Sequence, residues 1–256
     1  MTDPQAALEV RDIHKRFGNL EVIRGVSLRA SAGDVISLIG SSGSGKSTLL
    51  RCINLLEAPD QGALWFDGEP LALRRRRDGR LAPVSRAQIT RLRAQVGFVF
   101  QNFNLWPHMS ILENVIEAPI QVLRRPRDQV VAEAEELLRK VGLHDKRASY
   151  PAFLSGGQQQ RAATARALAM HPRVILFDEP TSALDPELVG EVLAVLRELA
   201  AEGRTMLIVT HEMRFAREVS SEVVFLHRGR VEERGPPEQV FDNPGSERCR
   251  AFLERV

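Results

Sequence analysis

The sequence predicts an α/β fold in which buried parallel strands alternate with helices. Short apolar runs recur at residues 35–39, 174–177 and 205–210, and each is followed by a glycine loop or by polar side chains. Such runs are typical of strands covered on both faces. Stretches with helical apolar spacing lie between them, and residues 40–48 (GSSGSGKST) join the first run to a helix. We expect a three-layer core with an antiparallel β subdomain and an inserted all-helical subdomain.

Composition places the chain among ordinary globular proteins. Its 256 residues are 43% hydrophobic and 27% charged, enough to bury one large domain. The 35 basic and 33 acidic residues give a formal charge of +2, so we expect no nucleic-acid partner. No stretch approaches the ~18 apolar residues of a membrane span, and MTDPQAALEV does not resemble a signal peptide. Any role at a membrane would therefore need a partner.

The two cysteines, Cys52 and Cys249, show no CxxC spacing. We interpret Cys52 as a core residue and Cys249 as a surface residue, both in a reducing compartment.

The N-terminal third predicts antiparallel strands before the core. Residues 8–17 and 22–30 alternate imperfectly between apolar and polar side chains and precede a turn at residues 32–34. Phe17 closes the first of these strands, either as a packing residue or as a platform for a nucleotide base. Another hairpin is expected around Gly68. The basic stretch 74–80 favours a solvated surface insertion over contact with acidic lipid or a partner protein.

Helical character begins after a short strand at residues 95–100, which Gln101 ends. Apolar side chains at 130, 131, 134, 137, 138 and 141 follow the spacing of an amphipathic helix. We expect Pro107, Pro119, Pro126 and Pro151 to break this region into pieces. The predicted boundaries place the core and β subdomain at residues 1–101 and 160–256, and the helical subdomain at about 102–159.

Two further strands deliver polar side chains to the carboxyl edge of the sheet. The run 174–177 ends in Asp178 and Glu179, and the run 205–210 leads to His211. Asp185 is expected to cap a helix that has Pro186 at its first position and Gly203 after its end. A short helix at 213–219, a hairpin around Gly229 and a helical C-terminal segment complete the chain.

The glycine loop is the strongest functional signal. Its glycines allow the backbone N–H groups to turn toward one concavity, and Lys46 and the following helix N-terminus add positive charge there. The Ser47 hydroxyl is placed to bind Mg²⁺. The loop residues expected to bind a nucleotide are Ser41, Ser42, Gly43, Ser44, Gly45, Lys46, Ser47 and Thr48.

A second phosphate-directed feature is LSGGQ at residues 154–158, just before a helical run. Ser155, Gly156 and Gly157 at a helix start form an anion site by the same physics, although Ser-Gly-Gly alone is also a common helix start.

Together these motifs identify a resemblance to the ATP-binding cassette (ABC) ATPases over nearly the whole chain. They follow the family order: the P-loop at 40–48 as Walker A, Gln101, the LSGGQ signature, Walker B at 174–179, the D-loop at 182–185 and His211. The resemblance implies a P-loop NTPase core. Phrases such as QNFNLWPHMSILENV and LFDEPTSALDPELVGEVL resemble the ATPase subunits of bacterial polar amino-acid importers, which implies ATP-driven uptake of a small polar solute.

The resemblance also assigns roles to single residues. Asp178 would hold Mg²⁺ through water, together with Ser47; Gln101 would sense Mg²⁺ and the γ-phosphate. Glu179 would polarise the attacking water, His211 would orient it, and Lys46 would bind the β and γ phosphates. Phe17 stands where the family most often has tyrosine at the base-stacking position.

The family mechanism implies partners as well. Ser155, Gly156, Gly157 and Gln158 would serve the ATP of a second copy in a head-to-tail homodimer, with Asp185 at the interface. The helical subdomain would contact integral membrane permease subunits at the cytoplasmic face of the inner membrane, and a solute-binding protein would act indirectly. An ABC ATPase for an osmolyte, a metal or export, and one that acts on nucleic acid, are the alternatives.

Overall fold

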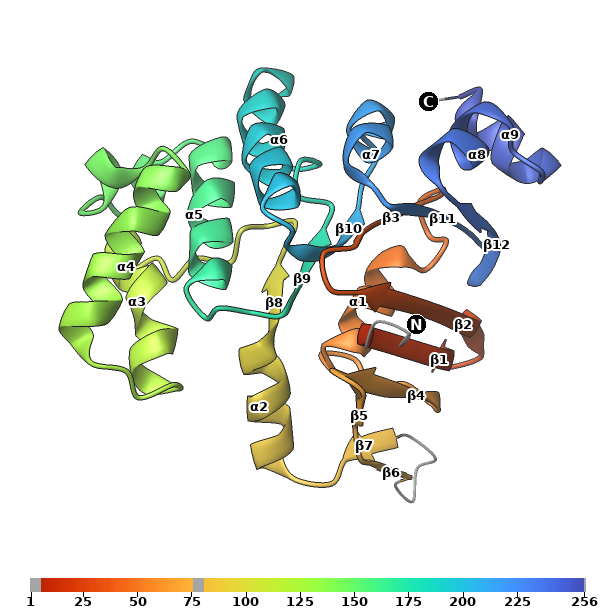
Figure 1. The fold of residues 1–256 in the computed structure, drawn as a ribbon, viewed down its shortest axis with the longest axis horizontal. Coiled ribbons are helices and arrows are strands. Elements are labelled where there is room, and N and C mark those ends of the chain that lie inside the picture. The colour runs from red at the N-terminus through yellow and green to blue at the C-terminus, as the bar shows by residue number, and fades with distance from the viewer. Residues whose placement is uncertain (1–5, 76–80, 256) are drawn as a thin grey trace, which may run out of the picture.

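The central sheet has the strand order β12-β11-β3-β10-β9-β8 (Figure 1). The computed structural model describes residues 6–75 and 81–255. In this sheet all neighbouring pairs except β11 with β12 are parallel, so those strands end at one edge. The strands are β3 (Val35–Ile39), β8 (Val96–Val99), β9 (Val174–Asp178), β10 (Thr205–Val209), β11 (Glu222–His227) and β12 (Arg230–Gly235).

Apolar layers cover both faces of this sheet, as the strand sequences predict. Along β9, Ile175 and Phe177 belong to one hydrophobic cluster, whereas Val174 and Leu176 belong to another. Because side chains alternate across a strand, the two clusters lie on opposite faces. Helix α6 (Pro186–Ala201) packs into the first cluster, and α1 (Lys46–Ile53) packs into the second. The predicted three-layer core is confirmed.

A second, antiparallel sheet covers the α1 side of the core. Its order is β2-β1-β4-β5. It contains β1 (Ala6–Phe17), β2 (Leu20–Ser31), β4 (Gln61–Phe66) and β5 (Glu69–Pro70). Leu8, Ile13 and Ile23 from these strands share a cluster with Leu49 and Leu50 of α1. The β subdomain therefore packs directly on the helix that follows the glycine loop.

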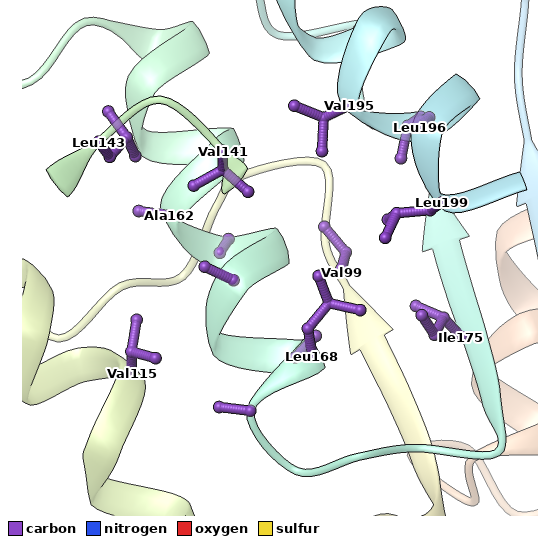
Figure 2. Packing of buried hydrophobic residues seen from close by; sticks show 14 of the residues in the cluster. Val99, Val115, Val141, Leu143, Ala162, Leu168, Ile175, Val195, Leu196 and Leu199 are labelled. Carbon is purple, nitrogen blue, oxygen red and sulfur yellow. The ribbon is translucent and has the colours of Figure 1, made fainter. Parts of the chain in front are cut away.

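The segment between β8 and β9 is helical. It comprises α3 (Ile111–Gln121), α4 (Arg127–Lys140), the 3₁₀ turns η1 (His144–Lys146) and η2 (Pro151–Phe153), and α5 (Gly156–Leu168). Figure 2 shows Val141 and Leu143 packing near Ala162 of α5, while Leu196 and Leu199 of α6 face Ile175. Helix α5 runs without a break across residues 159 and 160, so the division into subdomains stays a prediction.

Helices α7 (Met213–Val219), α8 (Pro237–Asp242) and α9 (Glu247–Leu253) complete the C-terminal part. Cys249 is fully buried with Val240 and Phe225, so its assignment to the surface is wrong. A single residue in a short amphipathic helix carries no periodicity that shows which neighbour covers it. Cys52 is buried as predicted, and burial raises the pKa of both thiols to about 12.

Pro119 does not break its helix as predicted. It lies inside α3, which continues to Gln121. The capping box of Ser110 and Glu113 stabilises the start of α3, and Ile111, Val115 and Pro119 itself are buried. The capping box and the burial of these side chains offset the loss of the one helical hydrogen bond that proline cannot make.

The region after β5 contains elements that the sequence pattern did not indicate. Strands β6 (Leu73–Arg75) and β7 (Leu81–Pro83) pair, and α2 (Arg86–Gln95) follows with only Leu92 buried. Arg74 and Arg75 lie in β6, but the rest of the basic stretch falls within residues 76–80, outside the described residues. In residues 6–75 and 81–255, no helix has the length and apolar character needed to cross a membrane.

Candidate nucleotide-binding site

The functional side chains gather at the carboxyl edge of the central sheet. The glycine loop follows β3, Asp178 ends β9 and is followed by Glu179, and His211 follows β10. Because β3, β10 and β9 are adjacent and parallel, their ends meet there.

The glycine loop has a backbone that only glycine can adopt. Gly40 has a φ of +141° and Gly45 a φ of +107°. A Cβ on Gly40 would lie 2.3 Å from the Leu226 carbonyl oxygen, and one on Gly45 would lie 2.6 Å from Ile23 Cδ1. The loop is therefore pressed against β11 on one side and β2 on the other.

Lys46 begins helix α1 and is buried, with 4% of its surface exposed. Its Nζ donates to the carbonyl oxygens of Gly40 (2.8 Å) and Ser41 (3.2 Å) and lies 3.9 Å from Glu179 Oε1. Burial lowers the pKa of Lys46, while Glu179 and Asp178 oppose this effect. The ammonium group is thus held inside the curve of its own loop, where a phosphate group can reach it.

A cavity of about 360 Å³ opens over this loop. It lies at the N-terminal end of α1, so the positive end of the helix dipole points toward it. The cavity is lined by Val22, Ser42, Gly43, Gly45, Lys46, Ser47, Thr48, Gln101 and Glu179. The structure therefore brings Gln101, which belongs to the segment after β8, to the glycine loop, as the family resemblance implies.

Asp178 lies at the end of β9 with 2% of its surface exposed. Burial raises the pKa of its carboxyl group, an effect opposed by the Ser47 hydroxyl and by Arg51, whose Nη2 lies 3.6 Å from Oδ2. Its other oxygen, Oδ1, is buried and has no hydrogen-bond partner within the described part of the chain. An unpaired carboxylate oxygen beside a serine hydroxyl fits a hard divalent cation.

Glu179 and His211 form a polar pair beside the cavity. His211 Nε2 lies 3.3 Å from Glu179 Oε1. This hydrogen bond lowers the pKa of Glu179, with burial opposing it, so the carboxylate is charged at neutral pH. Glu179 also has a φ of +49°, an uncommon conformation for a residue other than glycine. A charged base in a strained backbone is typical of a catalytic position.

Comparison with known proteins decides the family. Residues 23–182 match the family described as "ABC transporter". The chain belongs to this family. As an ABC ATPase it binds and hydrolyses ATP.

Several relatives align with this ABC ATPase along nearly its full length. It is 57% identical to the nopaline permease ATP-binding protein P of Agrobacterium fabrum, over 100% of both chains. It is 61% identical to the arginine/ornithine transport ATP-binding protein AotP of Pseudomonas aeruginosa, over 96% of this chain and 97% of that one. The histidine/lysine/arginine/ornithine transport ATP-binding protein HisP of Escherichia coli is 58% identical, over 96% of both chains.

Solved structures share the fold. CbiO1 of Clostridium perfringens, part of the ABC transporter complex cbiONQ, has a TM-score of 0.80 at 28% identity, covering 98% of this chain and 97% of that chain. The dimeric post-hydrolysis structure of the ATP-binding cassette MJ0796 with ADP and Pi has a TM-score of 0.75 at 32% identity, covering 90% and 98%. The predicted P-loop NTPase fold is confirmed.

The LSGGQ signature of this ABC ATPase, residues 154–158, is separate from the cavity over the glycine loop. Ser155 and Gln158 form a capping box at the start of α5, with hydrogen bonds of 3.2 and 3.1 Å. A Cβ on Gly156 would lie 3.0 Å from Leu184 Cδ2, and one on Gly157 would lie 3.2 Å from Leu188 Cβ. The signature thus packs tightly against the D-loop and α6, and none of its five residues, 154–158, lines the cavity over the glycine loop.

Three other predicted site residues, Phe17, Ser44 and Asp185, do not line the cavity over the glycine loop. Phe17 is 46% exposed at the end of β1, with Lys15 Nζ 5.0 Å from its ring centre, and it does not line the cavity. Ser44 Oγ is buried without a hydrogen-bond partner within the described residues. Asp185 occupies the N-cap position of α6, but its side chain makes no capping hydrogen bond. The prediction that Asp185 is the N-cap residue of this helix, with Pro186 at the first position, is confirmed, and its carboxylate is left without a capping hydrogen bond.

Two residues near the site were not predicted. Val22 of β2 lines the cavity, and no local pattern distinguishes it from other strand residues. Arg51 pairs with Asp178 and follows Ser47 by four residues on α1, so it lies on the same helix face. That i, i+4 spacing is the signal that could have found it.

Proposed function

We propose that this ABC ATPase uses MgATP to power uptake of a small polar solute, an amino acid, through a membrane permease. The observation that carries the proposal is the full-length similarity to ATP-binding subunits named for nopaline, arginine/ornithine and histidine transport. Two of these relatives are named for transport of polar amino acids and the third for a nopaline permease, and the alignments, at about 60% identity, span both the core and the helical segment.

The site geometry supports Mg²⁺ as the cofactor that accompanies ATP. Asp178 Oδ1, the Ser47 hydroxyl and the Gln101 amide oxygen are the groups that would hold it. The ion would neutralise charge on the transferred phosphoryl group. Lys46 would bind the β and γ phosphates. Glu179 would accept a hydrogen bond from the attacking water, and His211, which contacts Glu179, would orient that water.

The proposed active state is a head-to-tail homodimer. In one chain the signature residues 155–158 do not line the cavity, and the family resemblance implies that they bind the phosphates of a second copy. Asp185 is exposed and makes no capping hydrogen bond, which leaves its carboxylate available to the same interface. One solved neighbour of the fold, the cassette MJ0796, is described as dimeric in two structures. Phe17, half-exposed at a strand end, would stack on the adenine base.

An apolar groove beside β8 supports the permease as partner. It has a volume of about 360 Å³ and includes Leu56, Phe98, Phe100, Trp106 and Met170 in its wall. Leu56 and Trp106 are large apolar side chains with about two fifths of their surface exposed, 41% and 37%. An exposed groove of this kind fits an apolar segment of another protein. We propose that the protein is a peripheral subunit bound to the permease at the cytoplasmic face of the inner membrane. A solute-binding protein would act on the permease and not on this chain.

The test is capture of the partner. Tagged Glu179→Gln protein is incubated with ATP and detergent-solubilised membranes of the source organism, and bound proteins are identified by mass spectrometry. We expect a multi-span permease. A Glu179→Gln/Trp106→Ala double variant should bind ATP and dimerise as before but lose the permease. Recovery of nucleic-acid-associated proteins alone would contradict the transport function, while transport assays with the recovered permease and binding protein would identify the solute.

A further inference from the structure

A second cavity, of about 470 Å³, lies between β2 and β12. These strands contact each other although they belong to different sheets (Figure 1). The cavity is lined by Arg24, Gly25, Ser27, Arg230, Val231 and Arg234. It shares no lining residue with the cavity over the glycine loop, so it is a separate site.

The lining of this second cavity carries three guanidinium groups and no carboxylate. The Arg230 guanidinium group has no hydrogen-bond or ion-pair partner among residues 6–75 and 81–255, although its backbone pairs with His227 in the hairpin. Arg24 Nε lies 3.9 Å from the Glu21 carboxylate, and Arg234 Nε lies 3.9 Å from Glu222 Oε1. These long, partly exposed contacts neutralise little of the positive charge of the two arginines. They involve Nε alone, so the terminal nitrogens of both guanidinium groups remain able to donate hydrogen bonds.

Neighbouring polar groups do not cancel this charge. Asp12 lies beside Gly25, but its side chain is 72% exposed, so solvent screens its charge. Ser27 Oγ accepts a hydrogen bond from the Asp12 backbone N–H at 2.9 Å, which leaves its own hydroxyl hydrogen free to donate. The cavity therefore presents donors to whatever occupies it.

We infer that this cavity binds the phosphate group of a small phosphorylated ligand. Guanidinium groups match phosphate oxygens in pairs and bind them more strongly than neutral donors do. A volume within about 300–1,000 Å³ suits a small molecule. The inference does not depend on the transported solute or on the permease.

Backbone hydrogen bonds connect this second cavity to the glycine loop. The backbone N–H of Arg24 donates to the Gly229 carbonyl oxygen at 2.8 Å, and the Gly229 N–H donates to the Ser44 carbonyl oxygen at 3.0 Å. One turn, between β11 and β12, thus joins a wall of the second cavity to the glycine loop.

Calorimetric titration with inorganic pyrophosphate tests the site. The titration uses a Lys46→Ala background, in which binding at the glycine loop is weakened, at about 0.15 M salt to screen long-range attraction. We expect binding to persist there and to weaken at least about tenfold in Arg230→Gln, because a charge-assisted contact is lost. Arg234→Gln should act in the same direction.

Arg228→Gln is the matched control, because it removes the same charge from the same turn but does not line the cavity. It should leave the dissociation constant within about twofold. Equal weakening in Arg228→Gln and Arg230→Gln, or no binding in the Lys46→Ala background when that protein is folded by circular dichroism, would overturn the inference.

Co-sedimentation distinguishes the source of the phosphate group. Vesicles of phosphatidylcholine are compared with vesicles that also contain phosphatidic acid. Sedimentation that requires phosphatidic acid and Arg230 would assign the site to a lipid headgroup. Pyrophosphate binding without such sedimentation would assign it to a soluble phosphorylated compound.

Discussion

At the residue scale, Asp178 shows that a functional group can oppose stability. Its carboxylate is buried with one oxygen unpaired, and its pKa is raised by burial. A folded-state pKa above the unfolded value means that ionised Asp178 lowers stability at neutral pH, and that this loss disappears as pH falls below the unfolded value. Such a group is retained for what it binds.

We predict that Asp178→Asn raises the thermal midpoint of the nucleotide-free protein by ~2–4 °C, corresponding to about 1 kcal/mol. The same variant should lose the additional stabilisation that MgATP gives the wild type. Thermal unfolding followed by circular dichroism, with and without MgATP, checks both effects. Asp145→Asn, at a fully exposed carboxylate, is the control and should change neither. A less stable nucleotide-free Asp178→Asn protein would contradict the prediction.

Asp185 allows the helix-cap and interface roles to be separated. Because its side chain makes no capping hydrogen bond, Asp185→Ala should cost under about 0.5 kcal/mol of unfolding free energy. Ser110→Ala, which removes a capping box from α3, should cost about 1 kcal/mol. Urea denaturation of the monomers measures both.

In the same experiment series, ATP-dependent dimerisation should weaken in Asp185→Ala and remain unchanged in Ser110→Ala. If Asp185→Ala costs as much stability as Ser110→Ala and dimerises normally, the residue is a helix cap and not an interface residue.

At the element scale, the turn between β11 and β12 supports the glycine loop. Gly229 has a φ of +79°, and a Cβ there would lie 2.2 Å from the Val22 carbonyl oxygen. Its N–H is also the donor to Ser44. A substitution would therefore move the turn away from the loop that it holds.

We predict that Gly229→Ala weakens ATP binding at least about fivefold and lowers unfolding free energy by about 2 kcal/mol. Gly203→Ala is the control, because Gly203 has a similar φ of +73° but no atom within 4 Å of a Cβ. It should cost about 1 kcal/mol through backbone strain and leave ATP affinity unchanged. Titration with a fluorescent ATP analogue and urea denaturation give the two quantities. Equal effects of the two variants on ATP affinity would show that the turn has no special role.

At the scale of the whole molecule, the two phosphate-directed motifs of one chain do not line the same cavity. The Walker residues surround the cavity, whereas the signature lies at the start of α5 and packs on α6. The catalytic unit must therefore be larger than the chain if both motifs serve the same ATP.

Glu179→Gln tests this arrangement. Removing the carboxylate should reduce hydrolysis on the order of 10² to 10⁴-fold, because a positioned base is lost. With MgATP the variant should accumulate as a dimer, because ATP stays bound between the two copies. Light scattering after size-exclusion chromatography measures the mass. A variant that binds MgATP and stays monomeric would contradict the shared site.

Local sequence was sufficient to predict the strands of the two larger sheets, most helices and the position of the glycine loop. A buried strand, a helix N-cap or a glycine loop depends on residues close in the chain, so periodicity and motif spacing predict it. The adjacency of β3, β10 and β9 then brings Lys46, Asp178, Glu179 and His211 together by a general rule of parallel sheets.

Tertiary structure alone decided which distant groups meet and which side chains are covered. The burial of Cys249, the accommodation of Pro119, the support of Ser44 by Gly229 and the clustering of Arg24 with Arg230 all join or cover segments far apart in sequence. Burial and electrostatic contact depend on distance in space, and nothing in the local pattern around these residues specifies their neighbours.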